Sequence, residues 1–162
     1  MELNLSSQQL AEIEDCLHNL RHEGRARYVL VADTSGQLIE SAGHSAGMEP
    51  SVLAALAAGE IAATREIANL MDEGPGFKLL LHEGKRQSIY LSEVDEALIL
   101  AAIFQNTTPI GMVRLFTRLT VENLKDILEQ PQDPGEFEEE GTLRSDFDLL
   151  LSQELDLSFG SG

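Results

Sequence analysis

The order of apolar segments between Tyr28 and Gln130 constrains the fold of this chain more than any other feature. Short runs of β-branched and other apolar residues predict strands, whereas apolar residues repeated every three or four positions predict helices. The patterns predict a helix over 7–22, two strands, a helix over 50–71, three strands and a last helix that begins at Thr108-Pro109. The strands are expected at 28–32, 37–41, 77–82, 87–94 and 97–104.

The segment 97–104 is apolar at every position and is expected to be the central strand. Such a strand is covered on both faces of its sheet. The sequence therefore predicts one α/β domain over residues 1–130. Within it, Asp33 is expected in a hairpin turn, and Cys16, on the apolar edge of the first helix, is expected to be a buried packing thiol.

Composition and charge exclude several classes of partner. The chain of 162 residues carries a formal charge of −17, and only 5% of its residues are aromatic. Phosphate backbones and anionic membrane surfaces repel such a protein. A single cysteine, an N-terminus without a basic and apolar leader, and no apolar run of membrane-spanning length predict a cytoplasmic location. We expect neither nucleic acid nor membrane as a partner.

The helix over 50–71 carries two kinds of apolar surface. Bulky residues form a stripe that we expect to pack on the sheet, and small residues leave the adjoining surface nearly flat. The bulky stripe comprises Val52, Leu53, Leu56, Ala63, Ile67, Leu70 and Met71, and the small-residue surface comprises Ala55, Ala58, Gly59 and Ala62. Small residues allow close approach either of a partner protein or of the helix to its own sheet, and the sequence leaves both open. A glycine inside a helix lowers its stability by about 1 kcal/mol relative to alanine. The presence of Gly59 therefore needs an explanation, such as close contact with another backbone.

The segment 77–82 alternates less cleanly than the other strands and is expected at the sheet edge. An apolar edge strand tends to pair with another chain. We expect Phe77, Leu79 and Leu81 to form a dimerisation edge.

Composition changes sharply after the last helix. Residues 129–162 hold ten acidic side chains and one basic one, which is more than half of the excess negative charge. We expect an acidic linker over 131–142 and an amphipathic tail over 143–162. The tail repeats apolar residues every four positions and could fold on a partner or back on its own domain; its stripe comprises Leu143, Phe147, Leu150, Leu151 and Leu155.

The motifs of catalysis are absent from the sequence. Gly84-Lys85 follows no phosphate-binding glycine loop and is expected in a hairpin turn. His18 and His22 lie four residues apart, but no further ligand follows at a helical spacing, so a solvated pair is expected. We predict no catalytic residue, no metal and no cofactor, and hence a protein that is not an enzyme.

The order of elements resembles the Roadblock/dynein light chain family. The resemblance rests on VLVADTSGQLIESAG, LAALAAGEIAATREIANL and LILAAIFQNTTPIGMVRLFTRLTVENL and covers about residues 10–129. It implies an α/β/α sandwich with a five-stranded antiparallel or mixed sheet. It further implies that two copies join at the third strand into one continuous sheet, with their second helices side by side.

Residues 55–69 and the acidic tail resemble the bacterial members of this family that regulate a small Ras-like GTPase in cell polarity and motility. The resemblance implies a homodimer that activates GTP hydrolysis by repositioning the switch loops of the GTPase, while the tail aids nucleotide exchange. The contact residues it implies are Ala55, Ala58, Gly59 and Ala62, with Arg65, Glu66 and Asn69 as the polar rim. Arg65 could instead serve as an arginine finger. The alternative function is a scaffold for a motor or signalling complex that leaves hydrolysis unchanged.

Overall fold

The computed structural model describes residues 3–74, 76–77 and 79–131. These residues form three helices and five strands in the order that the sequence predicts. The elements are α1 (Ser7–Gly24), β1 (Tyr28–Asp33), β2 (Leu38–Gly43), α2 (Pro50–Leu70), β3 (Leu80–Glu83), β4 (Gln87–Val94), β5 (Leu98–Gln105) and α3 (Ile110–Leu128). The predictions for residues 132–162, including Leu143, Phe147, Leu150, Leu151 and Leu155, lie outside the described residues.

The five strands form one sheet in the order β2-β1-β5-β4-β3, and every neighbouring pair is antiparallel. β5 lies in the middle and is buried from Leu98 to Phe104, which confirms that the most apolar segment is the central strand. The turn before β2 is held by Asp33, whose carboxylate accepts hydrogen bonds from the backbone N–H groups of Ser35 and Gln37 at 3.0 and 2.9 Å. Asp33 is therefore a turn residue, as predicted.

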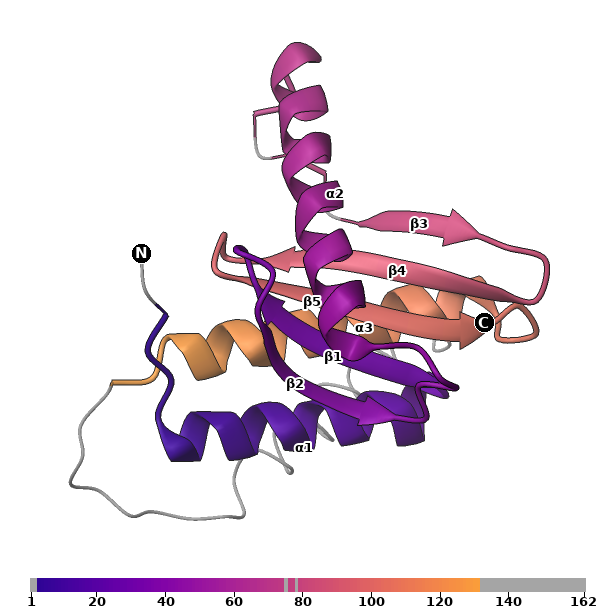
Figure 1. Ribbon diagram of the computed structural model, residues 1–162, viewed down its shortest axis with the longest axis horizontal. Helices are drawn as coiled ribbons and strands as arrows, with labels where there is room; N and C mark the ends of the chain where they lie inside the picture. The colour runs from indigo at the N-terminus through magenta and orange to yellow at the C-terminus, as the bar shows by residue number, and fades with distance from the viewer. Residues whose placement is uncertain (1–2, 75, 78, 132–162) are drawn as a thin grey trace, which may run out of the picture.

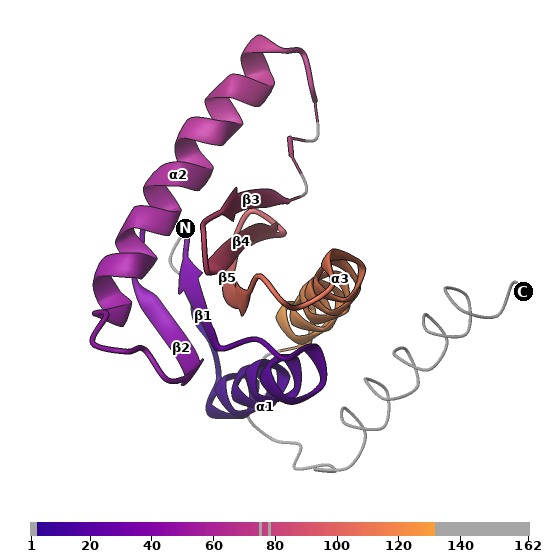
Figure 2. The same cartoon turned by 90° about the vertical axis from the view of Figure 1, so that its right-hand side faces the viewer.

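Helices cover both faces of the sheet and complete an α/β/α sandwich (Figures 1 and 2). On one face, α1 and α3 pack side by side over a core of aliphatic residues that includes Cys16, Leu17 and Phe104. On the other face, α2 lies alone and crosses the strands. Because α2 has no second helix beside it on this face, most of its residues are exposed.

Local signals at the helix ends match the sequence with one adjustment. Ser6 and Gln9 form a reciprocal capping box at the start of α1. Pro50 lies in the first turn of α2, where its missing N–H does no harm. The sequence predicts that α3 begins at Thr108-Pro109, whereas in the structure Pro109 is the N-cap and the helix begins at Ile110.

The third strand is shorter and later than predicted. The pattern predicts a strand over 77–82, whereas β3 spans Leu80–Glu83. The reason lies in α2, which ends beyond the sheet edge (Figure 2). The chain therefore uses the residues before Leu80 to return to the sheet, and only then can it pair with β4.

Candidate partner-binding surface on helix α2

Mainly small residues of α2 pack on the sheet, together with Ile61. Its buried residues are Ala54, Ala57, Ala58, Ile61 and Ala68. The expectation that the bulky stripe faces the sheet is wrong for most of its residues, since Leu56 is 66% and Leu70 88% exposed. Leu53 is the exception and packs against the core under α2. The sheet supplies the bulk on this side through Tyr28, Leu30 and Leu91, so alanines on α2 fill the remaining space at close packing density.

Two of the predicted contact residues are small because of their own domain. Ala58 is 7% exposed and belongs to the core under α2, so it does not lie on the outer surface as expected. Ala55 is exposed, but the hairpin turn between β1 and β2 approaches it. A Cβ added to Gly36 would lie 3.0 Å from the Ala55 Cα atom. The close packing of α2 on its own sheet therefore explains why residue 58 is small, and the nearby hairpin turn partly explains why residue 55 is small.

Gly59 and Ala62 have no such explanation within the domain. Both are exposed, and a Cβ built on Gly59 would meet nothing within 4 Å. Glu66 and Asn69 are exposed on the same helix. The structure thus places Ala55, Gly59, Ala62, Glu66 and Asn69 on the open side of α2 and removes Ala58 from that set.

Arg65 is tied to the sheet. Its guanidinium Nη2 forms an ion pair with the Glu93 carboxylate on β4. On the other flank of α2, His82 Nε2 of β3 contacts the Glu60 carboxylate. These two contacts join the flanks of α2 to β4 and β3.

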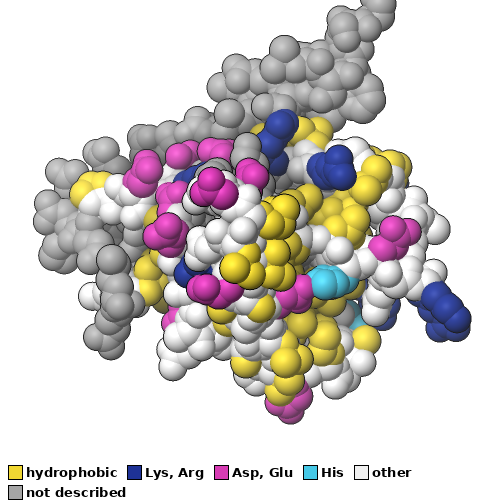
Figure 3. Space-filling view, turned by 90° about the horizontal axis from the view of Figure 1, so that it is seen from above, with side chains coloured by type: hydrophobic (Ala, Val, Ile, Leu, Met, Phe, Trp, Pro, Cys, Tyr) yellow, Lys and Arg dark blue, Asp and Glu magenta, His cyan; other side chains and the backbone are white. Residues whose placement is uncertain are grey.

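An apolar overhang distinguishes the C-terminal part of α2. The helix of 21 residues is about 31 Å long at 1.5 Å per residue. Five strands about 4.8 Å apart span only about 19 Å. About a third of a helix that crosses the strands must therefore project past the edge at β3, as Figure 1 shows. The projecting part and its C-cap carry Ile67, Leu70 and Met71, each at least half exposed. Figure 3 looks down on this end of the molecule, and apolar side chains gather on the face that it shows.

Sequence reasoning missed the outward-facing residues Leu56, Ile67 and Leu70, although a signal for them existed. α2 has apolar residues around its whole circumference. A helix that is apolar all round is normally covered on more than one side. Since only one side of α2 meets the sheet, the other is available to a partner.

The predicted dimerisation residues lie at or beside the open edge of the sheet. β3 pairs with β4 alone among the described strands, so its other edge has no strand beside it. Phe77 and Leu81 are 39% and 37% exposed, whereas Leu79 packs against the core under α1 and α3. The edge is short, which limits the pairing that it can make.

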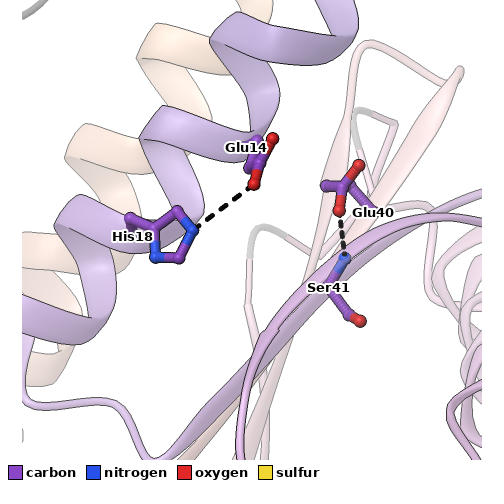
Figure 4. A network of polar contacts seen from close by, with 4 residues as sticks. All are labelled: Glu14, His18, Glu40 and Ser41. Atoms are coloured by element: carbon purple, nitrogen blue, oxygen red, sulfur yellow. Dashed lines mark hydrogen bonds and ion pairs between the residues drawn. The ribbon is translucent and has the colours of Figure 1, made fainter.

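Titratable side chains form no metal-binding cluster in the described part of the chain. There, no three His, Cys, Asp or Glu residues come close enough to hold a metal ion. His18 faces Glu14 one turn earlier on α1, with Nε2 and Oε1 3.6 Å apart (Figure 4). Burial, with smaller effects of Asp15, Glu12 and Asp126, raises the pKa of the Cys16 thiol to about 12. Cys16 is thus the packing thiol that the sequence predicts.

None of the helices in the described ranges is long and apolar enough to cross a membrane.

The structure is similar to solved structures of known proteins. The structure is similar to MglB from Myxococcus xanthus, with 32% sequence identity and a TM-score of 0.73 over 81% of this chain and all of that one. It is also similar to the gliding protein MglB from Thermus thermophilus, with 29% identity and a TM-score of 0.72 over 80% of this chain and 98% of that one. A search of curated protein sequences finds no match.

A more distant relative shares the fold alone. The Roadblock/LC7 domain from Streptomyces avermitilis is 14% identical and has a TM-score of 0.64 over 72% of this chain and 98% of that one. The family model of the Roadblock/LC7 domain matches residues 12–104, which run from within α1 to Phe104 of β5. The sheet order, the lone helix α2 and these matches agree, and the chain belongs to the Roadblock/LC7 domain family.

Proposed function

We propose that this protein is a homodimeric regulator of a small Ras-like, MglA-like GTPase and that it stimulates GTP hydrolysis. The observation that carries the proposal is the exposed apolar side of α2 on a domain similar to MglB. A large exposed apolar surface on a small domain normally marks a protein contact.

The overhang of α2 supports dimerisation at β3. A second copy that pairs with the open edge of β3 continues the sheet beneath the projecting part of α2. Ile67, Leu70 and Met71 then meet the second copy instead of water. Burial of three such side chains contributes several kcal/mol at about 1.5–3 kcal/mol each, which compensates for the shortness of the edge.

The remaining outer surface of α2 suits a second partner. Gly59 and Ala62 leave room for a backbone or a flat surface to approach, while Glu66 and Asn69 supply polar contacts at the margin. Two such helices side by side in the dimer form one broad seat, that is, a binding surface made of these residues from both copies. The GTPase would rest on this seat with its switch loops against the helices.

The ion pair of Arg65 favours activation without an arginine finger. A finger must reach into the nucleotide site of the partner, where it is worth about 10³–10⁵ in rate. Arg65 would first have to leave Glu93 and give up its charge-assisted hydrogen bond. We therefore assign Arg65 a positioning role on the rim and attribute activation to displacement of the switch loops.

The test is GTP turnover by the MglA-like GTPase of the same organism with and without this protein. We expect a clear acceleration of hydrolysis by the unaltered protein. Gly59→Arg should abolish both binding and acceleration, because the larger side chain fills the seat while it meets no atom of its own domain. Arg65→Ala should leave the accelerated rate within about tenfold of the unaltered protein.

Two outcomes contradict the proposal. A loss of about a thousandfold in Arg65→Ala, with binding retained, identifies Arg65 as a finger. Binding without any acceleration identifies the protein as a scaffold for a motor or signalling complex. Each outcome is read from the same two measurements, the affinity and the turnover rate.

A further inference from the structure

A small apolar pocket opens on the face opposite α2, where the β3–β4 hairpin meets the start of α3. The cavity has a volume of about 100 Å³, and its apolar lining comprises Leu81, Tyr90, Phe104, Ile110 and Val113. The Tyr90 and Phe104 rings meet edge to face with centroids 5.7 Å apart. Leu81 and Ile110 are 37% and 51% exposed. We name this site the hairpin-end pocket; it presents apolar side chains to solvent on the α1/α3 side of the sheet.

Positive charge borders the hairpin-end pocket. Lys85 and Arg86 form the hairpin turn, and the Asn106 backbone N–H, at the pocket wall, donates to the Arg86 carbonyl at 3.0 Å. Arg114 lies on the first turns of α3. Arg114 directly follows Val113 of the lining and lies one turn after Ile110 on the same helix. Burial raises the pKa of Tyr90, whereas the charge of Arg114 lowers it. Glu83 is the acidic side chain of the lining.

The basic border stands out in a molecule with a net charge of −17. Arg27 also lies at this end, where its Nη1 donates to the Gln87 side chain at 3.3 Å. The opposite end of the strands carries the β1–β2 and β4–β5 turns with Asp33, Asp95 and Glu96. Dark blue side chains accordingly project at the hairpin end in Figure 3. An apolar pocket with a basic border fits a ligand that is apolar on one side and acidic on the other.

The chain itself carries such a segment. Residues 143–159 repeat Leu143, Phe147, Leu151, Leu155 and Phe159 at helical spacing, and Asp146, Asp148, Glu154 and Asp156 lie between them. We propose that this C-terminal segment docks in the hairpin-end pocket of its own copy, with its apolar stripe on Leu81 and Ile110 and its carboxylates toward Lys85, Arg86 and Arg114.

The length of the chain permits this return. α3 has 19 residues and is about 28 Å long, and the pocket lies at its start. Residues 132–142 can span about 36 Å when extended. The linker is therefore long enough to run back along the whole of α3 and deliver residue 143 near Ile110.

Carbodiimide coupling of lysine to carboxylate in the full-length protein tests this contact. We expect Lys85 to couple to one or more of Asp146, Asp148, Glu154 and Asp156, as read by peptide mass spectrometry. Phe147→Asp, Ile110→Asp and Arg114→Glu should each lower the yield about tenfold, because each removes an apolar anchor or an attractive charge. Lys125→Glu makes the same charge change at the other end of α3 and should leave the yield unchanged.

An equal mixture of ¹⁴N- and ¹⁵N-labelled protein separates the two possible sources of the segment. Coupled peptides that carry one label support docking within a copy, whereas predominantly mixed-label peptides show that a second copy supplies the segment and overturn the proposal. A yield at Lys85 that equals that at Lys125, or that ignores Phe147→Asp, also overturns it. Circular dichroism melts of each variant establish that the domain remains folded. The GTPase is absent from this experiment, so its result is independent of the proposed function.

Discussion

At the scale of single residues, Asp33 shows how one carboxylate fixes a turn. Its carboxylate accepts from the backbone N–H groups of Ser35 and Gln37 and from the Ser35 hydroxyl. Partial burial raises the pKa of Asp33, but these hydrogen bonds outweigh it, and the pKa lies below the ordinary value of 3.8. The charged form is thus the one that the folded turn favours.

We predict that Asp33→Ala lowers the free energy of unfolding at pH 7 by about 0.5–1 kcal/mol, because the hydrogen bonds at this exposed turn are partly replaced by water. A pKa that is lower in the folded state gives stability above the unfolded pKa, and that stability is lost as the pH falls through the folded value. Urea unfolding at pH 7 and near pH 2.5 should therefore show the difference at the higher pH only. Thr34→Ala in the same turn is the control, and a difference that persists in acid would count against this role.

At the scale of elements, α2 is apolar on two opposite sides, and the residues on the two sides are explained by different contacts. The inner alanines match a sheet surface that is already filled by large side chains. The outer leucines and isoleucine match nothing within the described domain. Gly59 lies on the outer side, where it weakens the helix without relieving any close contact.

Gly59→Ala should separate stability from binding. The added methyl meets no atom within 4 Å, so we expect the free protein to gain about 1 kcal/mol of stability, or roughly 2–6 °C in Tm. If the GTPase backbone approaches Gly59 closely, its affinity should fall in the same variant. Calorimetric melting and titration measure the two effects. A more stable protein with unchanged affinity would show that the glycine is not needed for the GTPase, and Ala62→Gly should give the opposite change in stability.

At the scale of the whole molecule, α2 is longer than the sheet is wide and therefore overhangs one edge of it. A helix that overhangs an open edge strand offers an apolar surface and hydrogen-bonding groups to the same incoming copy. Both features lie at β3, whereas at the opposite edge of the sheet α1 packs against β2 (Figure 1). The fold thus has one edge prepared for association.

We predict that Leu70→Asp weakens the proposed dimer at least about tenfold, since it removes an apolar side chain that the second copy would bury and introduces a charge at the dimer contact. Leu70 is 88% exposed in the single copy, so the fold of that copy should be unaffected. Sedimentation equilibrium measures the change. Leu38→Asp, on β2 at the far edge, is the matched control. Equal dissociation by both variants would place the dimer contact elsewhere.

The sequence by itself determined the kind and order of the elements, the central place of β5 and the turn at Asp33. These features depend on periodicity, turn residues and continuous apolarity, which are local properties of the chain. The same local signals predicted the buried thiol of Cys16 and the position of β3 at the sheet edge.

Only the tertiary structure decided which side of α2 faces the sheet. A helix with apolar residues all round gives no local reason to prefer one side, and the choice fell to the volume of residues such as Tyr28 and Leu91, which are distant in sequence. The same packing moved Ala58 from the predicted contact surface into the core and turned Leu56 and Leu70 outwards. The late start of β3 likewise follows from where α2 ends in space, which the pattern of its own residues does not encode.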